Sequence, residues 1–205
     1  MYKHLMFIFM KKYFIGFILF LSLLTHFSCK KDKVEYPSNI IAVGAKYQGG
    51  IIAYIYQPSD PGYDPKQVHG IIAAPSDQSA GICWNPNPVF IPTNAVGTGI
   101  GTGKSNTEKI IQVQGAGNYA AKLCADLVLN GYSDWYLPSK SEFFQMISEK
   151  EAIGKFVFPD GIYWTSSEYT LNKDWVTRFY VDTKIISDGE YAKSELYRVR
   201  AIRYF

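Results

Sequence analysis

The sequence is poor in charge and in the residues that bind metals or attack substrates. Of its 205 residues, 19% are charged, three are cysteine and three are histidine. Low charge combined with 47% hydrophobic residues excludes an intrinsically disordered chain. After removal of the N-terminal segment described below, His69 is the only histidine, so a metal site with two histidines is impossible. We therefore expect a globular protein that binds no metal and no cofactor.

No apolar run is long enough to span a membrane. The run at residues 13–24 has about a dozen residues, whereas a helix needs about 20 to cross a bilayer. Lys11 and Lys12 precede this run and small residues follow it, which is the order of a secretory signal peptide. Met10 is a more typical signal start than Met1, and the sequence leaves the true start open.

Cys29 comes directly after this segment and resembles the lipidated cysteine of bacterial lipoproteins. Ser28 precedes it as in a lipobox, but His26 stands where a typical lipobox has leucine. We predict a signal peptide over residues 1–28, followed by the lipidated cysteine and a polar tether over residues 29–38. Acyl chains on Cys29 anchor such a chain stably. The expected location is the outer membrane, facing the periplasm or the cell surface.

Removing the signal peptide also removes the net charge. The formal charge of +3 comes from Lys3, Lys11 and Lys12, so 18 basic and 18 acidic residues remain without them. A neutral chain has no basic field that attracts phosphates, and we expect no nucleic-acid partner. The sequence leaves the oligomeric state open.

The apolar periodicity of residues 39–205 predicts one domain of mixed structure. Residues 51–56 and 70–74 read as strands, residues 119–129 and 139–150 as helices. Strands follow again at residues 163–167, 176–182 and 196–205. In the last of these, Arg198 and Arg200 alternate with apolar residues, so we expect the two arginines on one face. Strands, two helices and then strands is the order of an α+β fold.

Ser139 and Glu142 form a capping box at the start of the second expected helix. The serine is followed three residues later by glutamate, and Phe143, Met146 and Ile147 supply the apolar stripe. The helix is therefore expected to begin directly after Ser139.

Residues 79–107 show little periodicity and are expected to form a long loop, with residues 97–103 as a flexible turn. A loop of this length in a compact domain is usually functional. Aromatic rings stack on sugars, and amide or ammonium groups bind their hydroxyls. The candidate ligand-binding residues are therefore Trp84, Asn85, Asn87, Asn94, Lys104, Asn106 and, from a later strand, Trp175.

Catalytic patterns are weak. Gly103, Lys104 and Ser105 resemble the end of a phosphate-binding loop, but Thr98 stands where that loop needs glycine. Asp134 and Glu168 are the acid/base candidates that lie in motifs. Capping of the backbone, or pairing with Arg198 or Arg200, is the better explanation for both carboxylates. We predict no catalytic residues.

Cys83 and Cys124 remain once Cys29 is acylated. Export permits a disulfide between them. Cys124 lies on the apolar stripe of the first expected helix, where a thiol packs as a small hydrophobe. Both alternatives, a disulfide and two free thiols, stay open.

Several ordered motifs resemble the Lcl C-terminal domain family. Residues 131–142 read GYSDWYLPSKSE, residues 163–168 read YWTSSE and residues 198–203 read RVRAIR. Upstream, YQGG at residues 47–50, HGIIAAPSD at residues 69–77 and GTGKSNT at residues 101–107 match further blocks. The resemblance covers nearly all of the chain from Val43 to Phe205. Ser141, Glu142 and Phe143 stand where the family usually has Asp-Glu-Leu.

The resemblance implies a C-type-lectin-like fold, with two helices packed on twisted, mainly antiparallel sheets. The family is similar in fold to formylglycine-generating enzymes, but their catalytic cysteine pair does not align with Cys83 and Cys124. The Glu-Pro-Asn and Trp-Asn-Asp signatures of calcium-type lectins are absent. The resemblance therefore implies no activity and no metal.

These observations favour a lipid-anchored, non-enzymatic binding module of the bacterial envelope. Some members of the resembling family are adhesins, so a glycan or an envelope protein is the expected partner. An enzyme acting on an envelope polymer and a structural subunit of an envelope complex are the alternatives.

Overall fold

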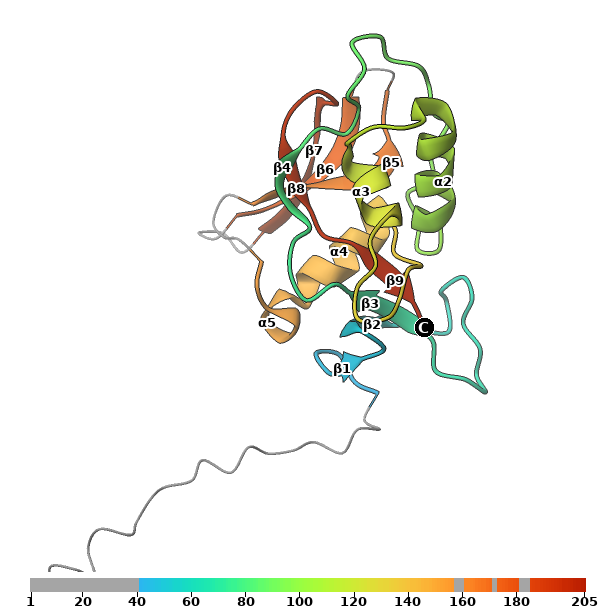
Figure 1. The fold of residues 1–205 in the computed structure, drawn as a ribbon. Coiled ribbons are helices and arrows are strands. Elements are labelled where there is room, and N and C mark those ends of the chain that lie inside the picture. The colour runs from blue at the N-terminus through green and yellow to red at the C-terminus, as the bar shows by residue number, and fades with distance from the viewer. Residues whose placement is uncertain (1–40, 157–160, 171–172, 181–184) are drawn as a thin grey trace, which may run out of the picture. The chain divides into compact units, whose positions relative to one another are not determined.

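Two β-sheets and the helices packed against them form the domain in the computed structural model (Figure 1). The structure describes residues 41–156, 161–170, 173–180 and 185–205. The predicted signal peptide, Cys29 and the tether lie outside these residues.

The first sheet has four strands in the order β1-β2-β3-β9, and all its pairs are antiparallel. Its strands are β1 (Lys46–Tyr47), β2 (Gly50–Ile55), β3 (Gly70–Ala73) and β9 (Ile202–Tyr204). Successive side chains of a strand point to opposite faces. Ile52 and Ile72 accordingly join one apolar cluster while Ala53 and Ile71 join another, so both faces of this sheet are buried.

The second sheet has five strands in the order β4-β8-β5-β6-β7. Its strands are β4 (Ser79–Ile82), β8 (Tyr197–Val199), β5 (Ile162–Glu168), β6 (Lys173–Tyr180) and β7 (Ile185–Ala192). The pair β5 and β8 is parallel and the other pairs are antiparallel. The predicted α+β class is confirmed: the sheets are mainly antiparallel and the helices lie between strands in the chain.

The described part of the chain contains four helices, where the sequence predicted two. They are α2 (Gly103–Gln114), α3 (Ala120–Ala125), α4 (Lys140–Ser148) and α5 (Lys150–Ile153). Helix α2 contacts α3 and β5, and Figure 1 shows α2 and α3 side by side. Helix α4 contacts β2 of the first sheet and β5 of the second. Helix α4 therefore packs on both sheets, whereas α2 packs on the second sheet.

The capping box of α4 is confirmed. The Ser139 hydroxyl accepts from the Glu142 backbone N–H at 3.4 Å, and the Glu142 carboxylate accepts from the Ser139 N–H at 2.8 Å. An N-cap of this kind contributes about 1 kcal/mol to stability. Both residues are fully buried. The cap therefore forms inside the core and fixes where α4 begins.

Helix α2 was not predicted because its buried face is largely polar. The buried residues are Gly103, Asn106, Thr107 and Ile110, which have the spacing of one helical face. Three of these four residues are not hydrophobic. A search for apolar periodicity therefore reads this helix as part of a loop.

The strand predicted over residues 196–205 is two strands in different sheets. The chain leaves the second sheet after β8 and enters the first at β9, and residues 200–201 form the crossing. Arg200 is fully buried there, and its guanidinium donates to Asp77 at 2.7 Å and to the Lys155 carbonyl at 2.6 Å. Arg198 lies 3.4 Å from the same carboxylate. Both arginines are therefore partners of one aspartate, with Arg200 buried and Arg198 partly exposed, which alternation along a single strand did not predict.

Candidate functional site

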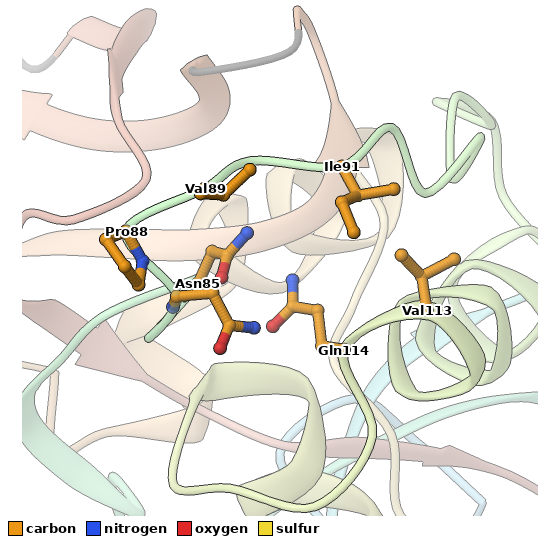
Figure 2. Close-up of a pocket in the computed structure, with 7 residues that line it drawn as sticks. Asn85, Pro88, Val89, Ile91, Val113 and Gln114 are labelled. Atoms are coloured by element: carbon orange, nitrogen blue, oxygen red, sulfur yellow. Dashed lines mark hydrogen bonds between the residues drawn. The ribbon is translucent and has the colours of Figure 1, made fainter.

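A cavity of about 320 Å³ lies between residues 85–91 and the last turn of α2 (Figure 2). Its size is at the lower end of the range for small-molecule sites. Four lining residues are apolar and three carry amides: Pro88, Val89, Ile91, Val113, Asn85, Asn87 and Gln114. Residues 85–91 belong to the loop that the sequence predicts to be functional, whereas Val113 and Gln114 belong to the unpredicted helix α2.

The loop is shorter than predicted, because β4 and α2 occupy its two ends. The segment that remains, residues 83–102, is held at its start by one carbonyl group. The Lys193 carbonyl accepts from the Trp84 N–H at 2.9 Å and from the Asn85 N–H at 3.0 Å. The Asn85 side-chain oxygen then accepts from the Asn87 N–H at 2.8 Å. The cavity wall is thus tied to the second sheet.

Gln114 places an amide without partners beside this wall. Its side chain points from the end of α2 toward the segment that carries Asn85 (Figure 2). Both amide atoms are shielded from solvent, and among the described residues neither has a hydrogen-bond partner. A buried polar group without a partner costs about 1–3 kcal/mol. Such a group in a native protein indicates a missing water or ligand. Gln114 carries no signal in the sequence, since only the packing of α2 isolates its amide.

Trp84 and Asn106 are not available to a ligand, which corrects the prediction for both. The Trp84 ring is fully buried, and its indole N–H donates to the Thr165 carbonyl at 3.0 Å. The Asn106 amide is 1% exposed and binds both backbone groups of Gly97, at 2.6 Å and 3.2 Å. These residues support the segment from inside.

Asn94 and Lys104 are not among the residues that line the cavity. Asn94 and Lys104 are exposed. Asn94 has a φ of 56°, and its carbonyl accepts from Lys109 at 3.1 Å. Trp175 lies in β6 opposite Glu190, and its side chain lies outside the described part of the structure. Of the predicted residues, the structure therefore brings Asn85 and Asn87 together in one cavity.

Residues 97–103 are held by hydrogen bonds, so the expected flexible turn is wrong. The Ser167 hydroxyl donates to the Gly97 carbonyl at 2.7 Å, and the Ser139 hydroxyl donates to the Gly99 carbonyl at 2.8 Å. The Gly101 N–H donates to the Glu142 carboxylate of α4 at 2.9 Å, and the Thr98 carbonyl accepts from the Ser141 N–H at 2.9 Å. These bonds fix the segment on α4 and β5, and at Gly103 the backbone comes so close to Glu142 and Ser139 that a Cβ would clash.

Glu168 is a structural carboxylate. It accepts from the Thr93 backbone N–H at 3.0 Å and from the Thr93 hydroxyl at 3.0 Å. The fully buried Lys193 ammonium forms an ion pair with it, and that ammonium also lies 4.4 Å from the centroid of the Trp84 ring. Arg198 and Arg200, which the sequence suggested as ion-pair partners of Glu168, pair with Asp77 instead.

Asp134 pairs with Arg203 through two hydrogen bonds, at 2.6 Å and 2.9 Å. Hydrogen bonding from the arginine lowers the pKa of the Asp134 carboxyl. Arg203 also lies 4.1 Å from the centroid of the Tyr132 ring. Asp134 is therefore an ionised group that anchors β9, and a general acid needs the opposite shift of its pKa.

Glu142 is the carboxyl group whose pKa is raised, and its burial is the cause. The Tyr204 hydroxyl donates to it at 2.5 Å, and the Gly101 N–H donates at 2.9 Å. The side chain is fully buried. A raised pKa in a cleft indicates a catalytic acid, but this carboxylate is enclosed by α4, β9 and residues 97–103.

Cys83 and Cys124, the cysteines within the described residues, form no disulfide. Burial raises the pKa of the Cys124 thiol strongly and that of Cys83 as well. Thiols whose pKa is raised are poor nucleophiles at neutral pH.

His69 binds the Phe205 carbonyl at 3.1 Å, so it joins β3 and the end of the chain.

A second cavity of about 540 Å³ lies beside the β1–β2 hairpin. Lys46 and Lys155 are among its lining residues. Among the described residues, none in this lining has a buried side-chain atom without a partner. The smaller cavity is therefore the better candidate site.

Within the described ranges, no cluster of three or more histidine, cysteine or acidic residues has a geometry suited to a metal. The same residues include no helix with the length and apolar character that crossing a bilayer requires.

Comparisons with known proteins give a family and a distant structural neighbour. A fimbrial protein from Bacteroides ovatus has a similar structure over 75% of this chain, with a TM-score of 0.51 and 13% sequence identity. The match covers 43% of that protein, so this chain spans less than half of its length and the likeness concerns the fold alone. No curated protein matches. The model of the Lcl C-terminal domain matches residues 74–203, and the chain therefore belongs to the Lcl C-terminal domain family.

Proposed function

We propose that this protein is a lipid-anchored, non-enzymatic binding module of the bacterial envelope whose ligand is a glycan. The observation that carries the proposal is the cavity beside α2, where the amides of Asn85, Asn87 and Gln114 meet apolar walls. Small-molecule sites combine apolar walls with a few placed polar groups. A C-type-lectin-like arrangement of the helices and sheets, as the family resemblance implies, is part of the proposal.

A binding role is favoured over catalysis by the surroundings of the acidic residues. Asp134 is paired with Arg203, Glu168 with Lys193, and Glu142 is enclosed by its cap. Each carboxylate therefore has a structural role. An enzyme acting on an envelope polymer needs an acid/base pair that faces a cleft.

The glycan proposal predicts that a charge at the cavity rim weakens glycan binding. Val89 lines the cavity and is 70% exposed, so Val89→Arg places a long cationic side chain at its mouth without disturbing the core. In a glycan array probed with the full chain in detergent, we expect binding to weaken by at least about tenfold, or 1.4 kcal/mol.

Val128→Arg is the matched control for this test, because Val128 is 73% exposed and does not line the cavity. Equal glycan binding by Val89→Arg and Val128→Arg would show that the binding site is not this cavity. If the unaltered chain binds no glycan, a structural subunit of an envelope assembly becomes the better proposal. The fold of the fimbrial neighbour and the exposed Val89, Ile91 and Val96 on one segment are compatible with that alternative.

The lipid anchor predicts a different result for Cys29→Ala. Acyl chains on Cys29 hold the protein at the membrane, since burial of a chain contributes about 0.8 kcal/mol per methylene group. We expect the variant to lose labelled palmitate and to leave the membrane fraction of cells. The outer membrane is the proposed location, and unchanged labelling together with unchanged fractionation would contradict the anchor.

A further inference from the structure

We infer that the cavity beside α2 binds the acetamido group of an N-acetylated amino sugar. This inference rests on the proposed glycan binding and specifies which part of the glycan is recognised. It starts from Gln114, whose two amide atoms lie at the cavity wall without partners among the described residues.

Helix geometry explains why the Gln114 side chain lies at the wall of this cavity. Gln114 is the last residue of α2, and Gly115 ends the helix with a φ of 69° while its N–H donates to the Ile111 carbonyl at 2.9 Å. The chain turns away after this point. The glutamine side chain is therefore left against residues 85–91, where Val89 and Ile91 form an apolar wall (Figure 2).

The lining selects a neutral ligand with an apolar part. No lysine, arginine, aspartate or glutamate lines the described cavity, so it offers no partner to an ionised group. The lining also contains no aromatic ring on which a sugar could stack. A simple hexose carries hydroxyls around its ring, and some of these would face Pro88, Val89, Ile91 or Val113 without partners.

An acetamido group matches the lining in each respect. It has one donor, one acceptor on the opposite side and one methyl group. The side-chain oxygen of Asn85 already accepts from the Asn87 N–H at 2.8 Å. The side-chain nitrogen of Asn85 is therefore the group that can donate to the ligand carbonyl. Gln114, on the facing wall, supplies an acceptor for the ligand N–H once its terminal amide turns toward the cavity. The methyl group then packs on the valine and isoleucine side chains.

In the protein without ligand, the unpartnered Gln114 amide is expected to lower the stability of the fold. Gln114→Met keeps the length of the side chain and removes the two unpartnered atoms. We expect the melting temperature to rise by about 2–4 °C, while binding of the acetamido group is lost. Gln112→Met is the matched control, because Gln112 is exposed on the same helix and does not line the cavity.

The experiment compares two neutral oligosaccharides of equal length by calorimetry with the full chain in detergent. We expect oligomers of N-acetylglucosamine to bind at least tenfold more tightly than cello-oligosaccharides, which lack the acetamido group. Gln114→Met should abolish that preference and raise the melting temperature. Gln112→Met should change neither quantity. If Gln114→Met does not fold, the affinities for the two oligosaccharides are compared in Val89→Arg, whose change lies at the exposed rim of the cavity. The preference for N-acetylglucosamine oligomers should be lost in that variant as well.

The outcomes separate this inference from the proposed function. Equal affinity for the two oligosaccharides overturns the acetamido inference and leaves glycan binding intact. A preference that survives Gln114→Met also overturns it, because recognition then lies elsewhere. Failure of every array glycan to bind overturns the proposed function itself.

Discussion

Lys193→Met is expected to destabilise the domain by about 3–5 kcal/mol, because it leaves the buried Glu168 carboxylate without its cation. Glu168 is 7% exposed, and Thr93 also donates to its oxygens, through its backbone N–H and its hydroxyl. The ion pair joins the residue after β7 to the end of β5. The same Lys193 residue holds Trp84 and Asn85 through its carbonyl. We therefore expect loosening at the wall of the cavity as well as lower stability, measured by urea unfolding.

A second lysine of the same sheet provides the control for this variant. Lys173 lies 3.6 Å from Glu190, and both side chains are partly exposed. Exposed pairs contribute about 1 kcal/mol or less, so Lys173→Met should have little effect. The double variant Lys193→Met with Glu168→Gln should recover part of the loss, because it removes the unpaired charge. Equal unfolding free energies for Lys193→Met and Lys173→Met would show that the buried pair contributes little.

Gly103→Ala is expected to destabilise the domain by about 3 kcal/mol through overpacking and loss of the α4 cap. A Cβ at this position would lie 2.2 Å from the Glu142 carboxylate and 2.8 Å from the Ser139 nitrogen. Glu142 would have to move, which breaks the capping box and its bond to Tyr204. The helix propensity that alanine adds is worth at most about 1 kcal/mol, which is too little to compensate.

Gly99→Ala tests the same segment without the close contact. No atom lies within 4 Å of the Cβ position at Gly99, and urea unfolding should find this variant within about 1 kcal/mol of the parent. A small effect for both variants would mean that α2 and α4 shift apart easily. Gly103 thus serves the approach of two helices, although the neighbouring Lys104 and Ser105 resemble part of a phosphate-binding loop.

Local patterns predicted the elements whose apolar residues follow the period of a strand or whose first turn carries a capping box. The strands at β2, β3, β5 and β6 and the start of α4 were expected from periodicity and from the cap formed by Ser139 and Glu142. These signals depend on neighbours within a few residues. Helix α2 has the same spacing with Asn106 and Thr107 on its buried face, and a pattern of hydrophobic residues cannot detect it.

Two predicted site residues were wrong for a related reason. A tryptophan and an asparagine among polar neighbours look exposed in the sequence. Trp84 is buried because the Thr165 carbonyl of β5 accepts its N–H, and Asn106 because Gly97 binds its amide. These partners are 81 and 9 residues away. The burial of a polar side chain is therefore a property of the folded chain and not of its local sequence.

The sequence by itself determined the α+β class, the cap of α4, the family and the stretch of chain in which the cavity lies. The tertiary structure alone decided which residues of that stretch face the cavity. It did so by packing α2 against residues 85–91, which brings Gln114 to Asn85 and leaves its amide without a partner. The physical reason is that periodicity and capping report contacts within one turn or strand. A binding site is made by contacts between segments, and only the packing of the whole domain specifies those.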